Sequence, residues 1–294
     1  MSLINQSYPL KSRAFLKRVN LQVQAALEED IGAGDLTAQL LPAKQLMTAR
    51  IIARENAVIC GVDWVNACFK QVDNTVSVDW LVMEGEQVDA NQPLCKLTGL
   101  ARSLLSAERC ALNFLQTLSA TATQTRKFVD AVAGTQAKIL DTRKTIPNLR
   151  LAQKYAVTVG GGFNQRLALY DGILIKENHI AAAGSISAVM QQALALGTTK
   201  SIQIEVENLQ ELQEALNAGA TNILLDNFSA DLLVKACELN KKLSHRAILE
   251  ASGGITLGNV REIALTGVDR ISVGGLTKNV QAIDLTMLIK KLAH

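Results

Sequence analysis

The stretch GGGFNQRLALYDGILIKENH, residues 160–179, decides the fold of this chain. It opens with three glycines and passes Arg166. It then forms the apolar run 173–175, which stops at Lys176. A short β-branched run that ends at a charged cluster is typical of a buried parallel strand whose C-terminal end carries a site. Taken by itself, the stretch fits a buried strand and a solvated loop better. The functional interpretation is favoured because the same pattern recurs downstream.

From residue 138 onward, short apolar runs alternate with amphipathic segments. The runs end at charged residues or at glycine, and they cover residues 139–140, 173–175, 202–204, 223–225, 248–249 and 271–273. Helical patterns such as residues 208–218 and 230–239 fill the gaps. This alternation predicts parallel strands joined by right-handed crossovers, and six units predict an incomplete α/β barrel. In such barrels the site lies where the strands end.

The first part of the chain has a different pattern. A helix is predicted from about residue 14, with Phe15, Val19 and Leu27 on its apolar face. Residues 48–98 predict short strands separated by turns such as Glu84-Gly85. Residues 104–132 carry leucines at helical spacing and predict a long helix.

Composition excludes several classes of protein. Thirty basic and 27 acidic residues give a net charge of +3, which lacks the clustered basic excess of a nucleic-acid or membrane-surface binder. Three histidines are too few to make a zinc site expected. Five scattered cysteines predict reduced, buried thiols. With no signal-peptide core and no run of membrane-spanning length, we expect a cytoplasmic protein.

Charged residues collect where the predicted strands end. Four are cations and two are carboxylates: Arg143, Lys144, Arg166, Lys176, Glu205 and Asp226. This set suits a polyanionic substrate that arrives with Mg²⁺, because Glu205 and Asp226 offer the oxygen ligands that Mg²⁺ prefers. Each residue alone would more often be an ordinary surface ion pair. The last two strands end in glycines, whose N–H groups can wrap a phosphate. The residues alone predict a magnesium-dependent binder or transferase for a phosphorylated, anionic ligand.

Several motifs resemble those of the quinolinate phosphoribosyltransferase family, also called the carboxylating nicotinate-nucleotide pyrophosphorylases. The resemblance runs through nearly the whole chain in order. The motifs are EDIGAGDLT (29–37), AERCALNFL (107–115), DTRKT (141–145), KYAV (154–157), GGG (160–162), KENH (176–179), EVE (205–207), LLDN (224–227) and ASGGI (251–255).

The resemblance implies a type II phosphoribosyltransferase fold. We expect an N-terminal open-faced α/β sandwich at residues 1–118 and a barrel at residues 119–278. A C-terminal helix at residues 279–294 is expected to rejoin the sandwich. The implied reaction joins quinolinate to 5-phosphoribosyl 1-pyrophosphate and yields nicotinate mononucleotide, pyrophosphate and carbon dioxide for NAD synthesis. The implied assembly is a homodimer, with a hexamer left open.

The resemblance also implies roles for individual residues. Arg143, Lys144 and Arg166 would grip the carboxylates of quinolinate, and Arg109 would reach the neighbouring subunit's site. Lys176 would lie between the substrates, with Glu205 and Asp226 at the ribose and Mg²⁺. Phosphate binding falls to Ser252, Gly253, Gly254, Gly274 and Gly275. Thr142, Gln165 and Val273 complete the expected substrate-binding set.

One position departs from the family pattern: Gln165 stands where the family usually has histidine. Glutamine can donate an N–H to a carboxylate but cannot become cationic. We therefore predict substrate binding that is less pH-sensitive around neutrality. Two alternatives stay open: a transferase of the same fold with a different pyridine or anionic acceptor, and a non-catalytic protein that binds a phosphorylated ligand. The paired Arg143 and Arg166 favour a dicarboxylate, and the intact charged set favours catalysis.

Overall fold

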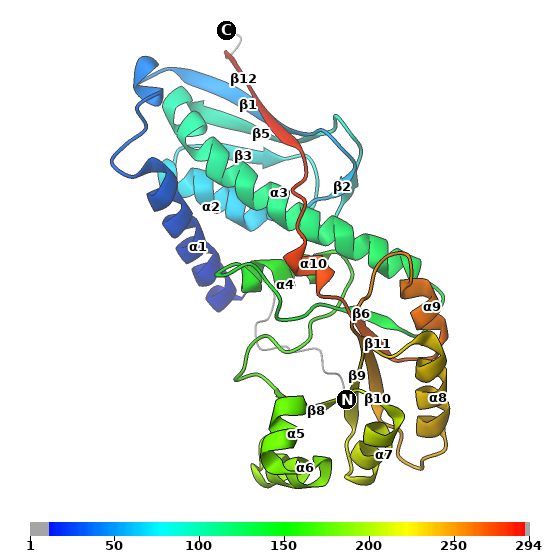
Figure 1. Cartoon of the computed structure of the whole chain (residues 1–294). Coiled ribbons are helices and arrows are strands. Elements are labelled where there is room, and N and C mark those ends of the chain that lie inside the picture. The colour runs from blue at the N-terminus through cyan, green and yellow to red at the C-terminus, as the bar shows by residue number, and fades with distance from the viewer. Residues whose placement is uncertain (1–11, 292–294) are drawn as a thin grey trace. The chain divides into compact units, whose positions relative to one another are not determined.

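The computed structural model describes residues 12–291, which form two compact units (Figure 1). One unit comprises residues 125–146 and 161–278, and the other comprises residues 12–124, 147–160 and 279–291. The division between the two units falls inside the long helix α3 (Ala101–Ala131), between residues 124 and 125. Residues 147–160, which we had expected in the barrel, belong with the N-terminal unit.

The N-terminal unit is built on an antiparallel sheet with strand order β12-β1-β5-β3. Its strands are β1 (Leu46–Ala53), β3 (Ser77–Trp80), β5 (Pro93–Leu100) and β12 (Leu285–Lys291). A small ladder joins β2 (Ala57–Val58) to β4 (Gln87–Val88). Helices α1 (Arg13–Ile31), α2 (Val62–Val72) and α4 (Arg150–Val159) supply the rest, with the 3₁₀ turn η1 at Ala38–Leu40 and most of α3. The predicted first helix, the strands around residues 49–53 and 93–97, and the long helix are confirmed.

The predicted C-terminal helix is wrong. Residues 285–291 form strand β12, which pairs antiparallel with β1. Leu285 and Met287 are buried, and Leu288 is exposed, so the apolar side chains follow the two-residue period of a strand. The segment does join the N-terminal unit, but through backbone hydrogen bonds to β1.

Helix α2 was not predicted, because residues 48–98 were assigned to strands and turns. Its buried side chains Trp64, Val65, Cys68 and Phe69 follow a helical period. Trp64 lies 5.6 Å, centroid to centroid, from the ring of Phe15, and these rings form part of the core of this unit. All five cysteines are free and buried, as predicted.

The second unit is built on a six-stranded parallel sheet with order β6-β11-β10-β9-β8-β7. Its strands are β6 (Lys138–Leu140), β7 (Ile173–Ile175), β8 (Ile202–Val206), β9 (Asn222–Asp226), β10 (Ile248–Ser252) and β11 (Arg270–Ser272). All six predicted strands are present. Within residues 12–291 no ladder joins β6 to β7, and only an isolated bridge links Leu140 to Phe163. The sheet is therefore an incomplete barrel.

Helices connect successive strands of this sheet (Figure 1). Between β7 and β11 they are α5 (Glu177–Ala183), α6 (Ile186–Ala195), α7 (Leu209–Asn217), α8 (Ala230–Lys241) and α9 (Val260–Leu265). The short helix α10 (Gly275–Lys278) follows β11. Side chains of Ser185, Asn208 and Ser229 accept hydrogen bonds at the starts of α6, α7 and α8, which fixes where each helix begins. None of the helices described is long and apolar enough to cross a bilayer.

Candidate active site

The ends of four adjacent strands place their polar side chains on one face of the parallel sheet. Ile175 is in register with Ile204, so Lys176 stands level with Glu205. Glu205 is in register with Leu224, and Asp226 is in register with Ser252. Residues in register on parallel strands point to the same face, and so do residues two apart on one strand. Lys176, Glu205, Asp226 and Ser252 therefore share the inner face at the C-terminal end of the sheet.

Lys176 and Glu205 form the central ion pair of this end. The Lys176 ammonium lies 3.0 Å from Oε1 and 2.8 Å from Oε2 of Glu205. The Glu205 side chain is 10% exposed, whereas that of Lys176 is 43% exposed. The Lys176 backbone N–H donates to Nδ1 of His179 at the start of α5, which fixes the backbone at the strand end. A lysine anchored on one side and open to solvent on the other can contact an anionic ligand.

Arg166 lies among charges of both signs. Its Nη1 donates to the carbonyl oxygen of Gly172 at 2.9 Å. Burial lowers the pKa of Arg166, the nearby Arg143 lowers it further, and Asp171 and Glu205 oppose the shift. Its buried Nε has no hydrogen-bond partner within residues 12–291. Because the two guanidinium groups repel each other, an anion bound between them would be stabilised.

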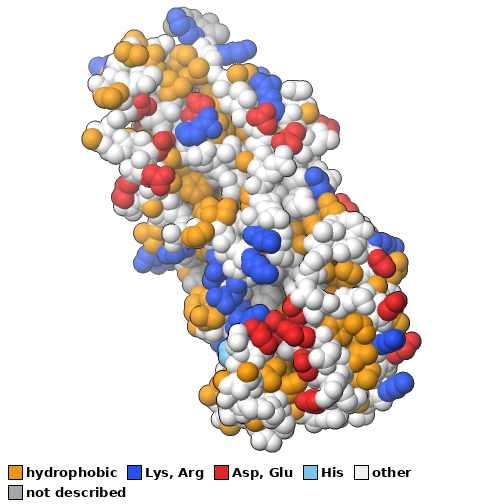
Figure 2. All heavy atoms as spheres, viewed as in Figure 1, with side chains coloured by type: hydrophobic (Ala, Val, Ile, Leu, Met, Phe, Trp, Pro, Cys, Tyr) orange, Lys and Arg blue, Asp and Glu red, His pale blue; other side chains and the backbone are white. Residues whose placement is uncertain are grey.

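Figure 2 shows lysine and arginine side chains next to acidic ones on the face of this unit that is in view. Such a mixed surface contrasts with the single-sign stripe of a nucleic-acid binder. It agrees with the balanced net charge of the sequence and with a cationic site that is local.

Lys144 is held against the end of β11. A Cβ built on Gly274 would lie 3.1 Å from Cδ of Lys144 and 3.6 Å from Oγ1 of Thr142. Oγ1 of Thr142 accepts a hydrogen bond from the Lys144 backbone N–H at 3.0 Å, and Oγ1 of Thr277 donates to the Lys144 carbonyl at 2.8 Å. The backbone N–H of Val273 donates to Leu140 at 2.9 Å. Four predicted site residues (Thr142, Lys144, Val273 and Gly274) are thus brought together, because β6 and β11 are adjacent.

Asn227 packs against the glycine pair after β10. It follows Asp226, has φ of +56°, and donates its backbone N–H to the Ser252 carbonyl at 2.9 Å. A Cβ on Gly253 would collide with Oδ1 of Asn227 and lie 2.9 Å from its backbone nitrogen, and Gly253 has φ of +94°. Gly253 is therefore required by close approach and by conformation. Nδ2 of Asn227 also donates to the Asp226 carboxylate at 2.7 Å.

Gln165 is connected to buried residues that lie outside the site predicted from the sequence. Its backbone N–H donates to Oδ1 of Asp141 at 2.9 Å, and its Nε2 donates to Oε1 of Gln203 at 2.8 Å. Nε2 of Gln203 donates to Oε2 of Glu250 at 3.0 Å. Asp141, Gln203 and Glu250 are all buried. The signal that could have found the last two is a polar residue within an otherwise apolar strand.

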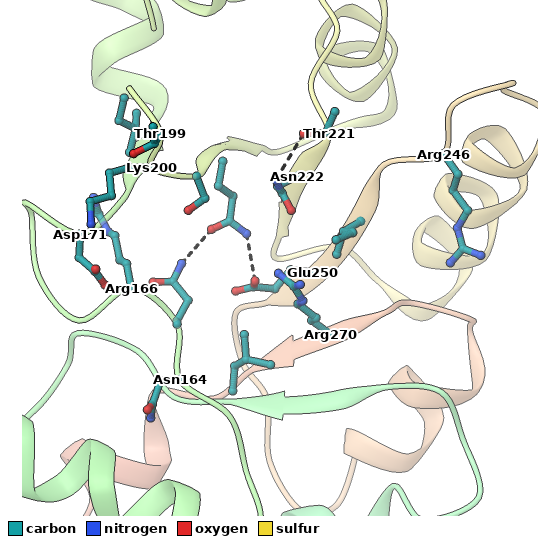
Figure 3. Close-up of a pocket in the computed structure, with 16 residues that line it drawn as sticks. Asn164, Arg166, Asp171, Thr199, Lys200, Thr221, Asn222, Arg246, Glu250 and Arg270 are labelled. Carbon is teal, nitrogen blue, oxygen red and sulfur yellow. Dashed lines mark hydrogen bonds between the residues drawn. The ribbon is translucent and has the colours of Figure 1, made fainter. Parts of the chain in front are cut away.

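A cavity of about 740 Å³ lies on the same inner face, toward the beginnings of β8–β11 (Figure 3). Its lining includes Lys200, Asn222, Glu250 and Arg270. Of the predicted site residues it contains Gln165 and Arg166, but not Lys144, Lys176, Glu205 or Asp226. The ion pair of Lys176 with Glu205 and the close glycines lie instead at the C-terminal end of the sheet.

The remaining predicted residues divide between the two units. Arg109 is exposed on α3, in the N-terminal unit. Gly254 has φ of +59°, and Gly275 begins α10. Residues 12–291 hold no group of three or more His, Cys, Asp or Glu side chains suited to a metal ion. Glu205 and Asp226, on neighbouring strands and the same face, are the carboxylates available to share a metal with a ligand.

Comparison with known families places both parts of the chain. Residues 121–288 match the C-terminal domain of quinolinate phosphoribosyl transferase, and residues 35–119 match its N-terminal domain. A relative from Bacillus subtilis, named probable nicotinate-nucleotide pyrophosphorylase [carboxylating], is 41% identical over 260 residues, which cover 88% of this chain and 89% of that protein. A relative from Mycobacterium leprae, named nicotinate-nucleotide pyrophosphorylase [carboxylating], is 41% identical over 270 residues, which cover 90% of this chain and 94% of that protein.

Solved structures show the same similarity. The nicotinate-nucleotide pyrophosphorylase of Francisella tularensis superposes with a TM-score of 0.90 at 44% identity, covering 94% of this chain and 97% of that one. The corresponding structure from Ehrlichia chaffeensis has a TM-score of 0.87 at 39% identity, covering 91% and 97%.

Proposed function

Because this chain belongs to the quinolinate phosphoribosyl transferase family, we propose that it transfers the phosphoribosyl group of 5-phosphoribosyl 1-pyrophosphate to quinolinate. The products are nicotinate mononucleotide, pyrophosphate and carbon dioxide, and the reaction serves NAD synthesis. The observation that carries this proposal is the ion pair of Lys176 with Glu205 on the face shared with Asp226 and Ser252. A non-catalytic phosphate binder would have no need of a lysine paired with a carboxylate at this position.

The acceptor end of the proposed site is cationic. Arg143 and Arg166 would each bind a carboxylate of quinolinate, because guanidinium groups match the planar geometry of carboxylates. The anion would also relieve the repulsion that lowers the pKa of Arg166. Gln165 would donate an N–H to one carboxylate.

The donor end would be formed by the strand ends and their glycines. Lys144 and Lys176 would neutralise the charge of the leaving pyrophosphate, and Ser252 with the adjacent glycines would hold the 5-phosphate. Glu205 and Asp226 would bind ribose hydroxyls and Mg²⁺. The donor set fits Mg²⁺, because two carboxylates leave coordination positions for phosphate oxygens and water. When bound, Mg²⁺ would neutralise phosphate charge.

The chemistry follows from this arrangement. The pyridine nitrogen attacks C1 of the ribose while the bond from C1 to the pyrophosphate oxygen breaks, and pyrophosphate leaves with the electron pair. The ring nitrogen is then cationic. The carboxylate on the adjacent ring carbon departs as carbon dioxide, and the electron pair left on that carbon is stabilised by the cationic ring and takes up a proton. This route requires no covalent bond to the enzyme.

We further propose that the enzyme is a homodimer in which Arg109 reaches the partner's acceptor site. Arg109 is exposed on α3, so it is accessible to a second subunit. We also propose a cytoplasmic location, since five free, buried thiols suit a reducing compartment.

The test is a coupled assay with quinolinate, 5-phosphoribosyl 1-pyrophosphate and Mg²⁺ that follows carbon dioxide and pyrophosphate together. The proposal expects release of the two products in equal amounts. Pyrophosphate release with nicotinate but not with quinolinate would overturn the choice of acceptor while leaving the donor assignment in place. No pyrophosphate release with any pyridine acid would overturn the transferase itself.

A further inference from the structure

Three buried or half-buried side chains form a continuous hydrogen-bonded relay inside the incomplete barrel. Glu250 on β10 accepts from Gln203 on β8 at 3.0 Å, and Gln203 accepts from Gln165 at 2.8 Å. Glu250 is 1% exposed and Gln203 is 6% exposed. Figure 3 shows both bonds as dashed lines, together with the labelled Glu250. The relay crosses the inner face one layer below Glu205.

The direction of this relay follows from the chemistry of its last member. Oε2 of Glu250 accepts the hydrogen bond, so Gln203 turns its amide nitrogen toward Glu250. Its amide oxygen then faces Gln165, which must answer with its own nitrogen. The amide oxygen of Gln165 is consequently directed away from Gln203. Without the carboxylate, both amides could rotate by half a turn and exchange donors for acceptors.

We propose that Glu250, acting through Gln203, fixes the orientation of the Gln165 amide and is a positioning residue for the acceptor end of the site. This inference rests on the proposed function, in which Gln165 contacts a carboxylate of quinolinate. One N–H of the Gln165 side-chain amide donates to Gln203, and this bond sets the orientation of the second N–H relative to the backbone. Neither Gln203 nor Glu250 touches the substrate in this arrangement.

The backbone of Gln165 is held independently of the relay. Asp141, which is fully buried, accepts the Gln165 backbone N–H at 2.9 Å and the Asn164 amide at 2.6 Å. Changes at Glu250 should therefore rotate the Gln165 side chain without moving its main chain. The charged groups that face Glu250 are Arg270 and Asp141, which act on it with opposite signs.

The decisive variant is Glu250→Gln, which keeps the size of the side chain but lets either end of its amide face Gln203. Its matched control is Glu238→Gln, a charge neutralisation at an exposed position on α8. Losing one oriented hydrogen bond to the substrate should raise KM for quinolinate about three- to ten-fold. KM for 5-phosphoribosyl 1-pyrophosphate should stay unchanged. In a Gln165→Leu background, Glu250→Gln should have no additional effect on KM for quinolinate.

A second measurement tests the relay without turnover. In protein labelled with ¹⁵N-glutamine, the side-chain amide signals of Gln165 and Gln203 can be assigned with Gln165→Leu and Gln203→Met. Glu250→Gln should move both signals, and Glu238→Gln should move neither. If Glu250→Gln does not fold, Gln203→Met should move the Gln165 signal and raise KM for quinolinate by the same factor.

Each outcome decides one question. A stationary Gln165 signal overturns the relay, and a moving signal with unchanged KM for quinolinate overturns the positioning role. Equal effects of Glu250→Gln with and without Gln165 overturn it as well. A wild-type enzyme that turns over no quinolinate contradicts the proposed function, and the amide signals then decide the relay by themselves.

Discussion

Replacing Lys176 by methionine removes the central cation of the proposed site and keeps the aliphatic stem. Lys176 is 43% exposed and Glu205 is 10% exposed, so the pair lies between a surface and a buried ion pair. Surface pairs contribute about 0–1 kcal/mol, and stranding a buried charge costs about 3–5 kcal/mol. We therefore expect a loss of about 1–2 kcal/mol in the free energy of unfolding. The rate should fall much further, by about 10²–10³-fold, which corresponds to roughly 2.7–4 kcal/mol of transition-state stabilisation.

The assay compares kcat/KM and thermal unfolding for Lys176→Met and Lys235→Met. Lys235 is an exposed lysine on α8, in the same unit, and carries no proposed role. Lys235→Met should leave both quantities near the wild-type values, and Lys176→Met should reduce turnover in a protein that stays folded. Turnover within threefold of wild type for Lys176→Met would refute the placement of the donor beside this lysine. A variant that unfolds at room temperature would refute the energetic reasoning, because it would show that the ion pair holds the unit together.

Further predictions follow from other contacts. Gly253→Ala should destabilise the fold by about 2–3 kcal/mol, because its Cβ collides with Asn227 and its φ of +94° is strained for alanine; normal denaturant midpoints would contradict this. If Arg109 acts across a dimer, mixing inactive Arg109→Ala subunits with inactive Lys176→Met subunits should restore about a quarter of wild-type activity. Random mixing makes about half of the dimers mixed, and each mixed dimer has one intact site out of two. No recovery after exchange would exclude the shared site. Burial raises the pKa of Glu250 above its ordinary 4.5. The folded state therefore binds the proton more tightly than the unfolded state does. The free energy of unfolding of wild type, relative to that of Glu250→Gln, should decline as pH rises from below 4.5 through the raised pKa. The decline should be about 1.4 kcal/mol for each pH unit between the two pKa values. A difference that is constant with pH would show that the carboxyl titrates alike in both states.

The parallel sheet could be predicted because two features of the sequence, the length of the apolar run and the residue at its end, identify each strand. Each apolar run is short, and each stops at a charged residue or at glycine, as at Lys176 and Gly274. The C-terminal strand was missed for the opposite reason. Residues 285–291 end in two lysines, and it is their backbone hydrogen bonds to β1 that make them a strand. That pairing joins segments more than 230 residues apart, and local propensity does not contain it.

The charged site was predictable as a set but not as a geometry. Strand order follows from crossover rules, so the pattern could indicate that Lys176, Glu205 and Asp226 converge. It could not indicate that Lys176 contacts both oxygens of Glu205, or that the Lys144 side chain packs against the backbone of Gly274. Such contacts depend on register, and a shift of one residue would move each side chain to the other face of the sheet.

The residues of the relay are marked in the sequences of their strands. A parallel strand covered on both faces should be apolar at every position. Strand β8 instead reads Ile-Gln-Ile-Glu-Val, and β10 reads Ile-Leu-Glu-Ala-Ser, with polar residues two apart. Residues two apart on a strand point to the same face, so these polar side chains form two successive layers on one face of the sheet. The outer layer, Glu205 and Ser252, lies at the strand ends where a substrate can reach it. The inner layer, Gln203 and Glu250, is buried, and its polar groups bind each other and Gln165. In the proposed site Gln165 would contact the substrate, and its uncharged amide is bound to a buried carboxyl group through a second amide.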